Sequence, residues 1–300
     1  MTDFLQQLII GLRIGSVYAL VALGYTMVYG IIRLINFAHG DFIMVGGYTL
    51  YFTIPIALYK LGLPAWVCVF AAIIVCALVG ITVELLAYRP VRKKGTNMSA
   101  LITAIAMSLF LENLAQAIGP IGPNPRVISE SIFSTRSINI GGVLTNQTSI
   151  LTIIIGAAVM IALQLFVQRT KLGRAMRAVS ENKNASTLMG IDVNNTIVTT
   201  FAIGSALAGV AALMYCAQYH TVTTTMGYML GLKAFIAAVL GGIGLIPGAM
   251  LGGLVIGIVE ALATAYVNSA LADTIVFLIL IVVLLIKPDG ILGKNVGEKV

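Results

Sequence analysis

The sequence predicts an all-α, polytopic membrane helix bundle with about eight to nine hydrophobic segments. Hydrophobic residues make up 59% of the 300 residues and charged residues only 10%. Soluble domains carry about 25% charged residues, so most of this surface must face hydrocarbon. The apolar runs are continuous rather than alternating, which favours helices over a membrane β-barrel. Thirty-one Gly residues fit helices that approach one another closely or break.

Nine apolar blocks divide the chain. They cover residues 5–32, 42–59, 65–87, 100–118, 150–167, 196–219, 230–245, 249–267 and 270–286. A block of about 18 residues or more can cross ~30 Å of hydrocarbon at ~1.5 Å per residue. The block 230–245 is shorter and rich in Gly, so we expect a broken or re-entrant helix there. The chain is then one transmembrane domain, 1–300, with short loops.

The cysteines and the N-terminus narrow the class further. Cys68, Cys76 and Cys216 all lie inside apolar blocks, where a free Cys behaves as a small buried apolar side chain. We therefore expect neither a disulfide nor a metal centre. Asp3 precedes the first block and no basic cluster does, which argues against a cleaved signal peptide. We expect the first block to remain in the mature protein.

Basic residues predict the orientation of the chain. Half of the 18 Lys and Arg fall in two short loops, namely Arg89, Arg92, Lys93, Lys94, Arg169, Lys171, Arg174, Arg177 and Lys183. The positive-inside rule places both loops in the cytoplasm. Counting blocks outward from them puts the tail with Lys287, Lys294 and Lys299 in the cytoplasm as well, and the N-terminus outside. The Pro-containing stretch 119–149 is then an external loop.

Polar residues interrupt the apolar sequence between the first two blocks. Asn36, His39 and Asp41 stand here around Gly40. At membrane depth such residues must pair, line water or cap a broken helix, so they mark a candidate translocation path. One interpretation is a proton relay through His39 and Asp41. The other, which the neighbouring glycines favour, is that Asn36 or Asp41 caps the next helix while His39 satisfies backbone groups nearby.

A second interruption lies near the end of block 230–245. Gly241, Gly242 and Gly244 precede Pro247, and this combination predicts a helix break on the candidate path. A phosphate-binding loop is excluded, because no Gly-Lys-Ser or Gly-Lys-Thr follows the glycines. We therefore expect this chain to bind neither ATP nor another cofactor. One interruption in each half fits a transporter built of two related halves.

Single charged residues stand within or beside the apolar blocks. They are Arg13, Glu84, Glu112, Lys233, Glu260 and Asp273. The ordinary role of such residues is a hydrogen bond or ion pair inside the bundle. Glu84 lies beside a basic loop and needs no further role. Glu260, deep in its block, and Glu112, with Asn113 and Gln116 close by, are better candidates for a polar path.

The basic loop at about 169–194 is the most distinctive polar segment. If residues 172–190 form one helix, Leu172, Met176 and Val179 share one face and the charged residues occupy the others. Such a helix suits either a membrane surface or a docking site for a partner protein. The residue pattern alone leaves both interpretations open.

Several motifs occur in the order found in a known family. They are GYTMVYG at 24–30, INFAHGD at 35–41, AYRPVR at 87–92, the glycine-containing segment 233–248 and PDGILG at 288–293. With these motifs the chain closely resembles the permease subunits of bacterial branched-chain amino acid ABC transporters over nearly its whole length. It is similar to the smaller of the two permease partners, because the long N-terminal extension typical of the other is absent.

The resemblance implies a multi-pass subunit of the bacterial inner (cytoplasmic) membrane, embedded in the lipid bilayer, that forms the path for leucine, isoleucine and valine by alternating access. The implied partners are a second permease subunit, two cytoplasmic ATPases that use the ATP, and an extracytoplasmic substrate-binding protein. No nucleic acid is implied. The loop at 169–194 then resembles the segment that couples such permeases to an ATPase, with Arg174, Arg177, Glu181, Ala185 and Gly190 as the expected coupling residues.

Two other functions stay open at this stage. Similar permeases import urea or short amides, which need polar partners different from those of a zwitterion. An ion-coupled secondary carrier that uses His39, Asp41 or Glu260 belongs to a different class of transporter. A membrane-embedded enzyme has little support, since no nucleophile with a base, metal cluster or cofactor loop is present in the sequence.

Overall fold

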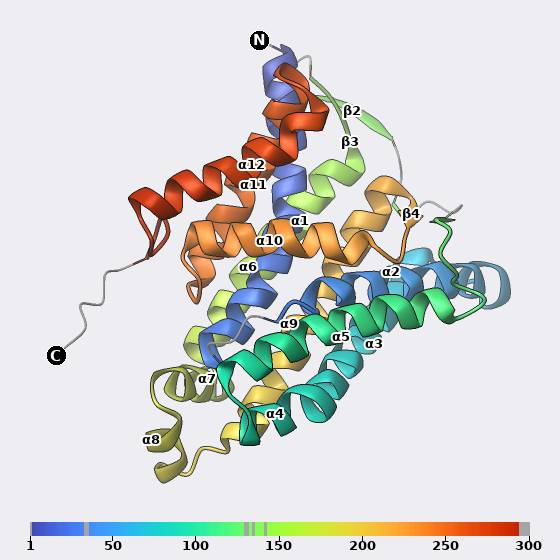
Figure 1. The fold of residues 1–300 in the computed structure, drawn as a ribbon. Coiled ribbons are helices and arrows are strands. Elements are labelled where there is room, and N and C mark those ends of the chain that lie inside the picture. Colours follow the sequence, from blue (N-terminus) through green and yellow to red (C-terminus); the bar gives the residue numbers. More distant parts are fainter. Residues whose placement is uncertain (1, 33–35, 129–131, 134–135, 141–142, 294–300) are drawn as a thin grey trace.

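The computed structural model is a bundle of helices (Figure 1). It describes residues 2–32, 36–128, 132–133, 136–140 and 143–293. Within these residues, eight helical stretches are long and apolar enough to cross a membrane. A ninth apolar helix, α10 (Met226–Gly241), has 16 residues and is too short to do so. The predicted all-α membrane bundle with one shortened helix is confirmed.

The long helices and the strands follow in this order along the chain. The helices are α1 (Thr2–Ile32), α2 (His39–Pro55), α3 (Cys68–Val83), α5 (Asn97–Ala117), α6 (Gln147–Arg169), α9 (Val193–Tyr219), α11 (Ile246–Tyr266) and α12 (Ser269–Ile286). Two antiparallel ladders join β1 (Arg126–Val127) to β4 (Thr221–Val222) and β2 (Ser137–Ile140) to β3 (Val143–Asn146). Three of these four short strands lie in the stretch 119–149 predicted as an external loop.

Shorter helical segments extend or connect the long ones. The π-helical turn Ile56–Lys60 continues α2, the 3-10 turn Ala65–Val67 leads into α3, and the π-helical turn Glu84–Tyr88 joins α3 to α4 (Arg89–Lys94). Between α6 and α9 stand α7 (Lys171–Glu181) and α8 (Lys183–Leu188). The basic loop at 169–194 is therefore largely helical.

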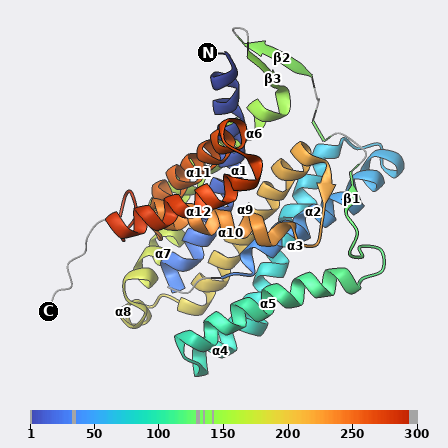
Figure 2. The same ribbon diagram turned by 45° about the horizontal axis from the view of Figure 1, so that its top comes forward.

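The bundle has two distinct ends. At one end, Gly30 and Ile31 of α1 line a small depression together with Met176 of α7 and Gly244, and the two ribbon views place α7 and α8 there (Figure 2). At the other end lie the N-terminal part of α1 and the β2–β3 ladder. The C-terminal segment returns toward the α7 end, since Ile291 donates a backbone hydrogen bond to Leu240 at 2.8 Å. Lys294 and Lys299 lie outside the described residues.

Helix packing follows the same plan in both halves of the chain. The helices α1, α2 and α3 of the first half correspond to α9, α10 and α11 of the second. α1 packs along α11, and α9 packs along α3. α2 contacts α3 and α9, and in the corresponding way α10 contacts α11 and α1. Since α1 runs toward the α7 end and α9 runs away from it, the two sets of helices cross the bundle in opposite directions. This is the arrangement of an inverted repeat, whose symmetry axis lies in the membrane plane.

Glycines allow the closest of these crossings. A Cβ placed on Gly253 of α11 would stand against the backbone of Ala19 in α1, and one on Gly40 of α2 would stand against Gly227 of α10. Without side chains between them, the helices make backbone-to-backbone contact. By contrast α5 and α12 are sparsely covered, with 17% and 11% of their most apolar stretches buried. These two helices present faces to lipid or to another subunit.

Replacing Gly253 by Val should disrupt the α1–α11 crossing. The added atoms meet helix backbone that cannot rotate away, so we expect a loss of roughly 1–3 kcal/mol of stability or more. Thermal unfolding in detergent, followed by fluorescence-detected size exclusion, measures the change. Gly119→Val is the matched control, because a Cβ there meets no described atom within 4 Å. Equal melting temperatures for the two variants would contradict tight packing at this crossing.

Candidate functional site

Two helices begin inside the bundle rather than at its ends. α2 begins at His39, and His39, Gly40 and Asp41 are all buried. The His39 ring packs against Tyr25 of α1, with ring centroids 4.8 Å apart. α10 begins beside it, where Gly227 meets Gly40. The first amides of both helices therefore lie in the interior, where they need partners from the protein or from a polar ligand.

The polar residues at the start of α2 have separate neighbours. Asn36 accepts a hydrogen bond of 2.8 Å from the Tyr88 hydroxyl. His39 faces Tyr25, whereas Asp41 faces Ser108 of α5. Ala38 occupies the N-cap position, and no side chain caps it. The interpretation that Asn36 or Asp41 is the N-cap of α2 is therefore wrong. The Asn36 side chain bonds to Tyr88 instead, and the Asp41 side chain lies toward Ser108 of α5.

The Gly-rich interruption forms the turn between α10 and α11. Gly242 and Gly244 have positive φ angles of 105° and 94°, which residues with a side chain rarely adopt. Gly241 accepts a hydrogen bond of 3.2 Å from the backbone of Leu292, so the C-terminal segment closes the end of α10. Gly244 lies near Gly30 and Met176, at the α7 end of the bundle. The structure thus places this break at one end of the bundle, away from the start of α2.

Charged residues from three helices meet on the other side of α10. The Lys233 ammonium lies 2.9 Å from Glu260 of α11 and 2.7 Å from Asp273 of α12. The Tyr18 hydroxyl of α1 donates to the second oxygen of Glu260 at 2.8 Å. We call Lys233, Glu260 and Asp273 the charged cluster. Together with Tyr18 it ties four helices together at a depth where unpaired charges are costly.

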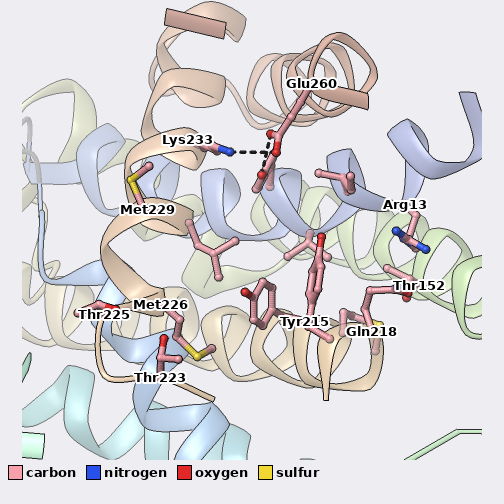
Figure 3. Close-up of a pocket in the computed structure, with 16 residues that line it drawn as sticks. Arg13, Thr152, Tyr215, Gln218, Thr223, Thr225, Met226, Met229, Lys233 and Glu260 are labelled. Atoms are coloured by element: carbon pink, nitrogen blue, oxygen red, sulfur yellow. Dashed lines mark hydrogen bonds and ion pairs between the residues drawn. The ribbon is translucent and has the colours of Figure 1, made fainter. Parts of the chain in front are cut away.

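A cavity of about 360 Å³ opens beside the charged cluster. Lys233 and Glu260 form one part of its wall, and Arg13 lies on another (Figure 3). One Arg13 nitrogen donates to Ser149 at 3.2 Å, and its Nε is buried without a hydrogen-bond partner among the described residues. The cavity lies in the half of the bundle away from α7, because α9 lines it with its C-terminal residues and α1 with its N-terminal half.

The structure brings together most of the intramembrane charges that the sequence singles out. Lys233, Glu260 and Asp273 form the cluster, and Arg13 joins Lys233 and Glu260 at the cavity. The other two stand apart: Glu84 pairs with Arg92 at 2.9 Å, and Glu112 accepts from Gln116 at 3.3 Å on α5. Sequence reasoning missed several lining residues, namely Tyr18, Thr152, Tyr215, Gln218 and Thr223. Tyr18 could have been identified from the sequence, because a hydroxyl within an apolar segment needs a hydrogen-bond partner.

At the α7 end, two capped helices replace the single helix expected over 172–190. Thr170 accepts from the amide of Gly173 at 3.0 Å and begins α7, and Asn182 accepts from the amide of Ala185 at 3.0 Å and begins α8. Leu172, Met176 and Val179 all lie in α7 at the spacing predicted for one apolar face; Met176 and Val179 are buried, and Leu172 is 48% exposed. Gly173 is buried beside them, because only Gly fits against the carbonyls that end α6.

The expected coupling residues all lie on the exposed side of α7 and α8. Exposed side chains are found at Arg174, Arg177, Glu181 and Ala185, and Gly190 follows with a φ of 80°. Between them, Leu188 and Met189 are 88% and 81% exposed. Two adjacent apolar side chains projecting so far from the protein are typical of a contact with a partner. We call Leu188 and Met189 the apolar tip.

The sequences of known proteins match this chain over nearly its whole length. A family model described as the branched-chain amino acid transport system permease component matches residues 7–285. BraD of Pseudomonas aeruginosa, a high-affinity branched-chain amino acid transport system permease protein, is 44% identical over 310 residues, which cover 99% of this chain and 98% of BraD. LivH of Escherichia coli is 43% identical over 307 residues, covering 99% and 98%.

The chain belongs to the branched-chain amino acid permease family. A second type of permease protein from such a system, LivM of Salmonella typhimurium, is also similar. It is 30% identical over 250 residues, which cover 76% of this permease and 57% of LivM. The family resemblance read from the sequence motifs is confirmed.

Removing Lys233 should destabilise this permease strongly. Lys233→Met leaves Glu260 and Asp273 facing each other without a cation, and loss of one partner of a buried pair costs about 3–5 kcal/mol. The solvent-exposed part of Asp273 reduces this figure. Melting temperature in detergent is the readout. The triple variant Lys233→Met, Glu260→Gln, Asp273→Asn should recover most of the loss. If the triple variant melts as low as the single one, the charges are not the cause.

Proposed function

We propose that this protein is one of two membrane subunits of an ATP-driven importer of branched-chain amino acids in a bacterial cytoplasmic membrane. Its full-length similarity to BraD and LivH carries the proposal. The second membrane subunit is a LivM-like permease, and two cytoplasmic ATPases and an extracytoplasmic binding protein complete the assembly. This permease performs no bond chemistry. It binds no ATP itself and moves between two packings that the nucleotide state of its partners selects.

The α7–α8 region is the proposed contact with an ATPase. It carries the dense positive charge expected of a cytoplasmic surface, and the same end of the bundle holds the C-terminal segment. The apolar tip projects from it between Ala185 and Gly190 and fits a groove on a soluble partner. Buried Met176 and Val179 fix α7 to the bundle, so a push on the tip moves α7 together with α1 and α9.

The proposed substrate path lies in the part of the bundle where helices are broken. The starts of α2 and α10 meet there, and the cavity lies in the half of the bundle away from α7. That half faces the extracytoplasmic side when α7 is cytoplasmic. A substrate released by a binding protein would enter from this side, and movement of α10 against α1 would pass it inward.

Reconstitution tests the proposed function. Proteoliposomes that contain this permease, its LivM-like partner and the ATPases should take up labelled leucine only with ATP inside and loaded binding protein outside. An importer of urea or short amides would instead transport labelled urea or acetamide under the same conditions. Leucine uptake driven by a proton or sodium gradient in liposomes that lack the ATPases would contradict the proposal and favour an ion-coupled carrier.

Changes at the apolar tip should uncouple the importer. Leu188→Glu with Met189→Glu places charges where a partner groove excludes water, so ATPase copurification should fall at least tenfold while membrane insertion is unchanged. Ala185→Trp, or a bulky residue at Gly190, should leave the complex assembled but separate hydrolysis from uptake. Leu61→Glu is the matched control, since Leu61 is 63% exposed and follows the π-helical turn Ile56–Lys60, outside the α7–α8 region. Normal substrate-stimulated hydrolysis and uptake in the tip and Ala185 variants would argue against docking here.

A further inference from the structure

The cavity contains charge of both signs in separate places. Lys233 and Glu260 of the charged cluster line the cavity, and Asp273 pairs with Lys233 from outside the lining, so the cluster as a whole carries one net negative charge. On another part of the wall, the Arg13 guanidinium contributes one positive charge, and no ion pair joins it to a carboxylate in the part of the chain that the structure describes. The charged cluster, Asp273 included, and Arg13 together are close to neutral, but they place opposite charges at two parts of the cavity, which form its two poles. A small ligand that complements it carries one positive and one negative group.

Both poles have hydrogen-bonding capacity to spare. Glu260 accepts from Lys233 on one oxygen and from Tyr18 on the other, and a carboxylate offers about four acceptor positions. Arg13 has five N–H donors, of which one reaches Ser149, and its Nε is buried with no described partner. An unsatisfied guanidinium donor in a cavity wall is costly unless a ligand or water pairs with it. A carboxylate matches this group best, because its two oxygens fit the guanidinium fork.

Apolar side chains form much of the remaining wall. Ile14 and Val17 come from α1, Met214 from α9, and Met226 and Leu230 from α10. Methionine adapts its shape to different aliphatic groups, so this wall suits several branched side chains equally well. The volume of about 360 Å³ lies at the lower end of the ~300–1,000 Å³ typical of small-molecule sites. It accommodates a single amino acid.

We propose that this cavity is a subsite within one subunit for a zwitterionic α-amino acid with an aliphatic side chain. Arg13 binds the carboxylate, Glu260 accepts from the ammonium group, and the side chain rests on the methionines and Leu230. The inference rests on the proposed function and names the residues that distinguish a zwitterion from a neutral amide. Urea or a short amide carries no charged group to place at either pole, so it would leave Arg13 without a counter-ion.

Binding to the intact complex tests the subsite without the binding protein. The complex of both permeases and the ATPases is placed in nanodiscs, and labelled leucine binding is measured by scintillation proximity. Valine and isoleucine should compete. Leucinamide, which lacks the carboxylate, and 4-methylpentanoate, which lacks the ammonium group, should compete at least tenfold more weakly than leucine. Equal competition by leucinamide would overturn the assignment of Arg13.

Arg13→Gln should weaken leucine binding at least tenfold and remove the preference for leucine over leucinamide, which a merely structural role of Arg13 would not change. Arg13→Lys should retain part of that preference. Arg126→Gln, at another Arg on the same side of the molecule but outside the cavity, is the matched control and should bind as the unmodified complex does. Unchanged leucine binding in Arg13→Gln would overturn the subsite.

ATP-driven leucine uptake by the same preparations distinguishes failure of the subsite from failure of the proposed function. If ATP-driven leucine uptake occurs but the complex without binding protein binds no leucine, the subsite is wrong and the proposed function stands. If neither binding nor ATP-driven uptake of any branched-chain amino acid occurs, the proposed function fails and the subsite fails with it.

Discussion

Backbone contact between helices at glycine is the constraint on which the rest of this bundle depends. α2 and α10 both begin in the interior, and their first turns meet where Gly40 lies against Gly227. Free amides at that depth have no water to bind, so neighbouring helices must approach closely enough to enclose them. The α1–α11 crossing at Gly253 provides the same close approach on the other side of the bundle. This close packing leaves a cavity of about 360 Å³ beside α10, lined by α1, α9 and α10.

The charged cluster links that cavity to the moving parts of the protein. Lys233 stands on α10, whereas Glu260 and Asp273 stand on α11 and α12, so a shift of α10 changes the geometry of the cluster. α1 runs from the cavity, at Arg13 and Tyr18, to the α7 end, where Ile31 lies beside Met176. A displacement of α7 by an ATPase can therefore reach the cavity through one rigid helix. ATP binding and hydrolysis by the partner then change how the helices pack, and the geometry of the charged cluster differs between the two packings.

Composition and apolar block length predicted the class and the order of the spans, and the glycines before Pro247 predicted the helix break. The family followed from the resemblance of the sequence motifs to known permeases. Sequence reasoning could not predict that Arg13, Lys233, Glu260 and Asp273 would converge, since helices distant in the sequence bring them together. The single helix expected over 172–190 failed for a local reason: Asn182 caps a new helix there. Leu188 and Met189 drew no attention because their exposure is a property of the fold and not of their residue types.

The central claim is that the nucleotide state at the α7 end changes the width of the cavity at the opposite half. Spin labels at Gln218 of α9 and Met229 of α10, which both line the cavity, report that width in the assembled complex by pulsed electron resonance. We expect the distance distribution to shift between the nucleotide-free and the vanadate-trapped states. Superimposable distributions in a complex that actively hydrolyses ATP and imports leucine would contradict the account.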